Sequence, residues 1–197
     1  MQTYRARSSV VWGWVAIGLG VVVAVIHVST VGFEYATGGL GLGAAAALFG
    51  YGAFLRPHVA TYEDRVELHN VTQTATMPFS RLADLDTRWS LEVIGDDGLK
   101  VGAFAAPAPG GVSARRQHVE DKRNDVVDGG VPGRMGDKLG TPSGDAAALV
   151  HRASSAWHEA HPTAPASEGP SVTRSPDWLG IVVMAAALAA TLWGLFG

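Results

Sequence analysis

An uncharged apolar segment near the N-terminus constrains this chain more than any other feature. Residues 10–31 contain no Asp, Glu, Lys or Arg. At about 1.5 Å per residue, a helix of this length spans roughly 30 Å, which matches the hydrocarbon core of a bilayer. Arg5 and Arg7 are also compatible with a cleaved signal peptide, but the apolar stretch is too long for one and no clear A-x-A site follows it. We therefore expect a retained transmembrane helix.

A second apolar segment, residues 39–55, has the composition of a closely packed membrane helix. It is rich in Gly and Ala, and Gly39 and Gly43 belong to a small-xxx-small row. Such rows let two helix backbones approach closely in lipid. The short connection to the first span makes the two antiparallel, so we expect packing against the region of Gly18 and Gly20. A Gly/Ala-rich span without any special contact is the plainer alternative.

A third apolar segment, residues 178–196, completes a predicted multi-pass topology in the plasma membrane. All 15 Lys and Arg residues lie in the N-terminal tail, residues 1–9, or within residues 56–174, whereas the loop between the first two spans carries only Glu34. Basic residues close to membrane spans favour the cytoplasmic side. We expect the N-terminal tail and residues 56–160 to be cytoplasmic, and the C-terminus to lie outside the cell.

Between the second and third spans, residues 56–106 show the pattern of short antiparallel strands. Val66 and Leu68 fall on one face of a strand, and the Glu63–Asp64 turn separates this strand from the one before it. Six such strands separated by tight turns leave no room for the crossover helices of a parallel sheet. The sequence predicts a small all-β domain of six to seven antiparallel strands, arranged as a curled sheet or a partly open barrel.

Three segments of different composition follow the predicted strands. Residues 107–142 are rich in Gly, Pro and charge, and we expect a mobile insertion there. Residues 143–160 are expected to form an amphipathic helix that begins at Ser143 as N-cap and covers the open end of the β domain. Residues 161–177 have the Pro/Ser/Ala composition of a linker. The apolar stripe of the predicted helix consists of Ala146, Leu149, Val150, Ala153 and Trp157, with Trp157 as the largest contact.

The order of strands followed by one C-terminal helix is the plan of a pleckstrin-homology (PH) fold. Several short motifs carry a closer resemblance: Arg56-Pro57, Val66-x-Leu68-x-Asn70, Met77-Pro78-Phe79, Leu99-Lys100-Val101, Phe104-Ala105-Ala106-Pro107, and the run from Gly140 to Leu149. Together they resemble the membrane-anchored bacterial PH-domain proteins of actinobacteria, similar to the low-molecular-weight protein antigen 6 PH family. The resemblance covers about residues 10–157 and implies a fold rather than a reaction. The seventh strand of a PH domain has no clear counterpart in the sequence.

Several classes of function are disfavoured by composition. A formal net charge of −3 gives no basic footprint for nucleic acid, and the absence of cysteine excludes thiolate and zinc–thiolate sites. PH domains that bind phosphoinositides use Lys and Arg beside the first hairpin loop, where this chain has Glu63, Asp64 and a single Arg65. We expect no enzyme activity, no cofactor and no metal. His158 and His161 are one residue too close for the H-E-x-x-H zinc motif.

Two groups of residues stand out as candidate sites. A basic cluster in the insertion could contact anionic lipid headgroups, although acidic neighbours offset its charge. It consists of Arg115, Arg116, Lys122 and Arg123. His27 is the only ionisable side chain in the first span, and a polar residue there suggests an intramembrane site. A neutral imidazole bonded to a backbone carbonyl or to interfacial water is the alternative for His27.

These observations favour a non-catalytic, membrane-anchored PH-like interaction or scaffold protein that acts at the cytoplasmic face. Its expected partners are the lipid bilayer and a membrane protein, or a second copy of the chain held through the Gly-rich second span. The first alternative is an anionic-lipid-sensing module that uses the basic cluster. The second is a small transport or enzyme component that uses His27.

Overall fold

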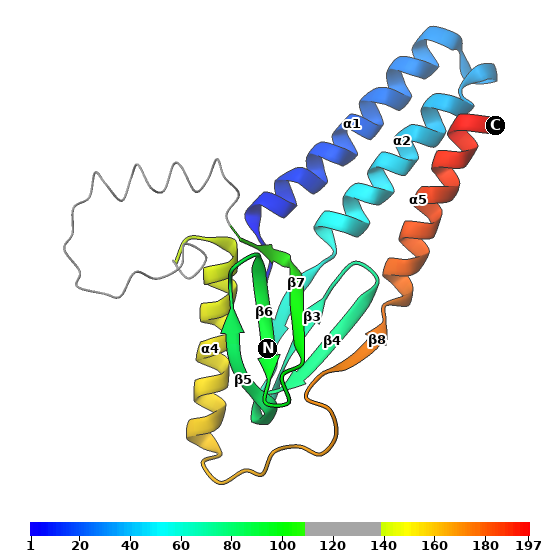
Figure 1. Cartoon of the computed structure of the whole chain (residues 1–197). Helices are drawn as coiled ribbons and strands as arrows, with labels where there is room; N and C mark the ends of the chain where they lie inside the picture. The colour runs from blue at the N-terminus through cyan, green and yellow to red at the C-terminus, as the bar shows by residue number, and fades with distance from the viewer. Residues whose placement is uncertain (109–138) are drawn as a thin grey trace, which may run out of the picture. The chain divides into compact units, whose positions relative to one another are not determined.

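The computed structural model describes residues 1–108 and 139–197, which form two compact units (Figure 1). The β unit comprises Met1–Arg5, His58–Leu68 and Ala75–Thr173, and the membrane unit comprises Ala6–Pro57, His69–Thr74 and Arg174–Gly197. Residues 109–138 lie outside the described part of the chain. Most of the expected insertion, including the basic cluster from Arg115 to Arg123, falls in that range.

Three helices of the membrane unit are long and apolar enough to cross a bilayer. They are α1 (Arg7–Val31), α2 (Thr37–Gly50) with its π-helical continuation η2 (Tyr51–Leu55), and α5 (Trp178–Phe196). The short 3-10 turn η1 (Phe33–Tyr35) joins the first two. Each of the three predicted spans is therefore helical, and the first begins three residues before the apolar segment that predicted it.

Glycines bring α2 close to both neighbouring helices, and Figure 1 shows α2 between α1 and α5. A Cβ added at Gly43 would lie 2.5 Å from the carbonyl oxygen of Gly20 on α1, and one added at Gly41 would lie 2.5 Å from the Cα of Gly194 on α5. The predicted packing at Gly20 is confirmed. Within the predicted region the contact is made at Gly20 and not at Gly18, which faces open space with no atom within 4 Å of its would-be Cβ.

An ion pair fixes the start of α5 within the membrane unit. The Arg56 guanidinium donates to both carboxylate oxygens of Asp177, with Nη2 2.6 Å from Oδ1. The same carboxylate caps the helix by accepting from the Gly180 amide at 3.2 Å. The backbone N–H of Asp177 donates to the Thr72 carbonyl at 2.9 Å. These bonds fix both the side chain and the backbone of Asp177, the residue immediately before α5.

The strands within residues 1–108 and 139–197 form two sheets. The first has the order β1 (Gln2–Tyr4), β2 (His58–Thr61), β3 (Arg65–His69), β4 (Gln73–Pro78) and β8 (Thr173–Pro176). The second has the order β5 (Leu82–Asp86), β6 (Ser90–Gly95) and β7 (Lys100–Pro107), with a 3-10 turn, η3 (Phe79–Arg81), before β5. All six predicted strands are present. The two additional strands come from the N-terminal tail and from the predicted linker.

The helix predicted to cover the β domain is α4 (Pro142–Ala160), which contacts strands of both sheets. Val150 and Ala146 are fully buried in the core with Phe79, Met77 and Leu91, while Trp157 packs against the edge of this core. The prediction of Ser143 as N-cap is wrong. Thr141 caps the helix by accepting from the Gly144 amide at 3.1 Å, and Pro142 takes the first helical position, where an N–H would have no partner in the helix.

Residues 161–172, which we call the strap, follow α4 and are fastened to the β unit. Arg81 donates to the carbonyls of Ser167 and Gly169, and Ser171 donates to the Asp97 carboxylate through both its hydroxyl (2.5 Å) and its amide (3.0 Å). Ser171 is fully buried and meets Gly95, where any side chain would collide with it. The strap therefore differs from the flexible linker that its composition suggested, because Arg81 and Asp97 bind it at Ser167, Gly169 and Ser171.

The bonds between Ser171 of the strap and Asp97 predict how the stability of the fold changes in acid. The Ser171 hydroxyl and amide, followed by the Leu99 amide, lower the pKa of Asp97 from 3.8 to about 2. Since the folded pKa is depressed, this carboxylate stabilises the fold above pH 4, and its contribution is lost as the pH falls toward 2. Melting curves between pH 6 and pH 2 should show a loss near pH 4–2 that is smaller in Asp97→Asn. An unchanged profile in the variant would contradict the assignment.

Candidate functional site

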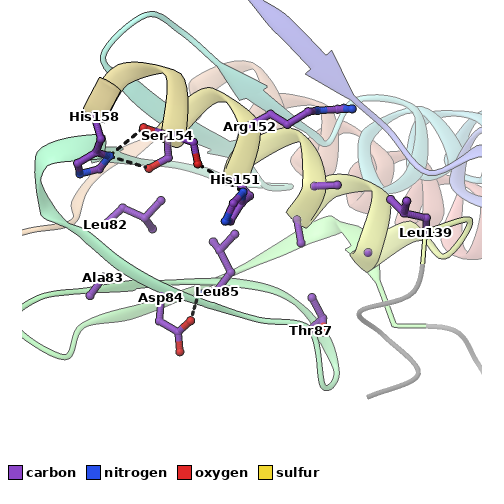
Figure 2. A pocket seen from close by; sticks show the side chains of 14 residues that line it. Leu82, Ala83, Asp84, Leu85, Thr87, Leu139, His151, Arg152, Ser154 and His158 are labelled. Atoms are coloured by element: carbon purple, nitrogen blue, oxygen red, sulfur yellow. Dashed lines mark hydrogen bonds between the residues drawn. The ribbon is translucent and has the colours of Figure 1, made fainter. Parts of the chain in front are cut away.

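A groove of about 760 Å³ lies between β5 and α4, within the β unit (Figure 2). One wall is the strand, which contributes Leu82, Ala83, Asp84 and Leu85. The other wall is a row of α4 residues at helical spacing, namely Gly144, Ala147, Ala148, His151, Ser155 and His158, joined by Arg152 and Ser154. Thr87 and Leu139 complete the lining.

The groove has an apolar floor because its leucines belong to the edge of the core. Leu82, Leu85 and Ala147 are half-buried and pack against the buried cluster. Ala83 and Asp84 are exposed on the strand. Ala147 and Ala148 leave the helix wall without bulky side chains at its centre. The space therefore remains open beside β5 instead of being filled by side chains of α4.

Two histidines on α4 are oriented by bonds to their own helix. The Nδ1 of His158 lies 2.8 Å from the Ser154 carbonyl oxygen, and the Nδ1 of His151 lies 3.5 Å from the Ser155 hydroxyl. A carbonyl oxygen can only accept, so His158 Nδ1 carries the proton of this bond. In the neutral ring, Nε2 of His158 is then an acceptor, and on protonation it becomes a donor.

The charged groups of the groove are unevenly distributed between its walls. Arg152 stands with both histidines on α4, and Asp84 supplies the one carboxylate among the described lining residues. The Asp84 Oδ1 accepts the Leu85 amide at 2.8 Å (Figure 2). A side chain of β5 thus satisfies a backbone donor of the same strand. The Arg152 side chain extends from the other side of α4 (Figure 2), so the surface of the helix that faces β5 is cationic when the imidazoles are protonated.

A second hollow of about 750 Å³ lies on another side of α4, beside β1 and β2. Trp157 lines it with His161, and their rings are stacked at 5.2 Å between centroids. His161 caps the end of α4, and its Nδ1 donates to the Trp157 carbonyl at 3.0 Å. Across the described residues, no three His, Asp or Glu side chains are placed to hold a metal ion.

His27, the candidate intramembrane site, is bonded to the backbone of its own unit. Its Nε2 lies 3.3 Å from the Tyr35 carbonyl oxygen, and its ring packs against Gly38 and Gly39 of α2. A side chain at Gly39 would collide with the imidazole. This arrangement agrees with the alternative interpretation of His27, an imidazole bonded to a backbone carbonyl.

The groove was not predicted from the sequence, although part of its signal was present there. His151, Ser155 and His158 recur at helical spacing beside the apolar stripe, and only His158 was weighed, as a metal ligand. The four basic residues proposed to contact lipid, Arg115, Arg116, Lys122 and Arg123, lie outside the described residues. The chain matches no protein-family model, no curated protein and no solved structure. The features that point to a function are therefore the groove and the three apolar helices.

Proposed function

We propose that this chain is a non-catalytic, membrane-anchored interaction protein that holds a partner protein in the groove between β5 and α4. The observation that carries the proposal is the open, apolar-floored groove beside the edge strand of a three-stranded sheet. Its walls present imidazoles, hydroxyls and one carboxylate, which suit reversible binding. The three apolar helices anchor the groove to a bilayer.

The β unit is proposed to be PH-like and cytoplasmic. Two antiparallel sheets followed by one helix that contacts both agree with the plan of that fold. Arg5, Arg7 and Arg56 flank the spans and favour the cytoplasmic side for both the tail and the β unit. The family resemblance to actinobacterial membrane-anchored PH proteins remains part of this proposal.

Phosphoinositide binding at the first hairpin is not part of the proposal. Arg65, the first residue of β3 and the one basic residue beside the turn between β2 and β3, is bonded to Glu67 at 2.8 Å and to Asp64 at 3.0 Å. Its guanidinium also lies 4.4 Å from the centroid of the Tyr62 ring. A headgroup phosphate would have to compete with two carboxylates for this cation.

Association through the Gly-rich second span stays a prediction. Less of the surface of α2 is available for it, because α1 and α5 already cover part of this helix. Gly39 and Gly43 contact α1, and Gly41 contacts α5 of the same chain. A shallow apolar groove of about 380 Å³ between α2 and α5 remains, lined in part by Ala45, Ala46 and Phe49. Contact with a membrane protein or a second copy would use that surface. The lipid-sensing and His27-centred alternatives have no further support among the described residues.

The proposed function is tested by crosslinking within intact cells that express the chain natively. A photo-crosslinking amino acid at Ala83 or Ala148 should yield one protein adduct, whereas the same residue at the exposed Phe104 on β7 should not. Ala148→Trp should then abolish recovery of that adduct without lowering the melting temperature, because the indole fills an open groove. Ala156→Trp, on the side of α4 that lines the second hollow, is the matched control and should leave the adduct intact. Equal adducts at all positions would overturn the proposal.

A further inference from the structure

We propose that the groove binds an extended acidic segment of the partner, which adds as a strand to the free edge of β5. This inference rests on the proposed function and specifies the chemistry of the partner. Among the described strands, β5 is an edge of its sheet, with β6 on its other side. Edge strands present backbone donors and acceptors that another extended chain can use.

The backbone of β5 already shows how such an addition would be bonded. The Leu85 amide donates to the Asp84 carboxylate at 2.8 Å, so an oxygen of a neighbouring side chain occupies the position that a carbonyl of an added strand would take. Asp84 is exposed and can rotate away. Without a partner, the Leu85 amide of this edge already has an acceptor in the Asp84 carboxylate, which limits aggregation. The amide becomes available to a partner when an extended chain displaces the carboxylate.

The dimensions of the groove fit a short extended segment. From Gly144 to His158 the helix wall rises by fourteen residues at about 1.5 Å each, or roughly 21 Å. An extended peptide of about six residues has the same length at about 3.3 Å per residue. Alternate side chains of such a peptide would face the apolar floor at Leu82 and Leu85, and the others would face the helix or solvent.

The charge of the helix wall selects an acidic occupant. Facing the groove are His151 and His158 from α4 and Asp84 from β5. Arg152 is the remaining charged residue of the described lining, but its side chain extends from the other side of α4 (Figure 2), and it lines the second hollow as well. With both imidazoles protonated, two cations face one carboxylate. With both neutral, the carboxylate is the one charge that faces the groove. Because histidine side chains change charge between about pH 5 and 8, binding of an acidic segment should strengthen as the pH falls.

The test uses the full chain in phosphatidylcholine nanodiscs and fluorescent six-residue peptides of alternating Asp and Val, or of alternating Lys and Val. At pH 6 the acidic peptide should bind at least about tenfold more tightly than the basic one, which corresponds to about 1.4 kcal/mol. Its affinity should fall by about tenfold at pH 8. His151→Gln combined with His158→Gln should remove this pH dependence, and Asp84→Asn should tighten binding.

Two controls identify the mode and the place of binding. N-methylation of alternate peptide nitrogens removes backbone donors and should abolish binding if the peptide adds as a strand. Ala148→Trp should abolish it as well, and Ala156→Trp should not. Absent binding at pH 6, preference for the basic peptide, or indifference to N-methylation would each overturn the inference. Such a failure leaves the crosslinking result untouched, so it is distinguishable from failure of the proposed function.

Discussion

Asp177→Ala is expected to lower the free energy of unfolding of the membrane unit by about 3–5 kcal/mol. The carboxylate binds the Arg56 guanidinium through both oxygens and caps α5 at the Gly180 amide. The two side chains retain only 18% and 8% of their exposure. Removing the carboxylate leaves a largely buried cation without this counter-charge and also removes the helix cap, which alone contributes about 1 kcal/mol.

Two further variants separate these effects in the detergent-solubilised full chain. Asp177→Asn keeps a capping oxygen but removes the charge, so it should lose most of the same stability. Combining it with Arg56→Met removes both charges, and stability should largely return, because replacing a buried pair by neutral side chains is often close to neutral. Unfolding by sodium dodecyl sulfate, followed by tryptophan fluorescence, measures the difference. A double variant as unstable as the single one would contradict this account.

The Arg56–Asp177 ion pair also determines how the stability of the membrane unit changes with pH. Burial raises the pKa of Asp177, but the Arg56 hydrogen bond and the Gly180 amide lower it by more, and the net result is a lowered pKa. Since the folded pKa lies below the unfolded value of 3.8, the stabilisation is present above that pH. It is lost as the pH falls through the folded pKa.

The parts of the fold with a long, regular pattern were predictable from the sequence. Hydropathy located the three membrane helices, since a span needs a continuous apolar segment. Period-two alternation located the strands, and Val66 and Leu68 are buried as expected. The apolar stripe of α4 is buried along Ala146 and Val150. In each case a local pattern, either a continuous apolar segment or a regular period, is sufficient, so no knowledge of distant residues is needed.

The remaining features depend on contacts between residues far apart in the sequence. The strand β1 has only three residues, too few for a period, and it forms by pairing with β2. Ser171 is ordered by Asp97, and neither residue identifies the other in the sequence. The groove depends on which strand lies beside α4. Sequence reasoning placed α4 over the β domain but had no means of assigning β5 as its neighbour.

Gly20→Leu is expected to cost the membrane unit about 3 kcal/mol, at the upper end of the usual cost of overpacking. A Cβ at Gly20 would overlap the carbonyl oxygen of Gly43 and lie 3.2 Å from the amide nitrogen of Ala47. Both obstructions are backbone atoms of α2, so no side-chain rotation can relieve the overlap. The two helices would have to separate, and the close packing that substitutes for a hydrophobic driving force in lipid would be lost.

Gly18→Leu is the matched control because it makes the same substitution two residues away on the same helix. No atom lies within 4 Å of the position that its Cβ would occupy. Its leucine would face the surroundings of the helix, and the stability of the unit should change little. Dodecyl sulfate unfolding of both variants measures the contrast. If both lose equal stability, added bulk in α1 is harmful wherever it is placed. A loss confined to Gly20 would instead locate the helix contact at the Gly20–Gly43 crossing, where only hydrogen fits between the two backbones.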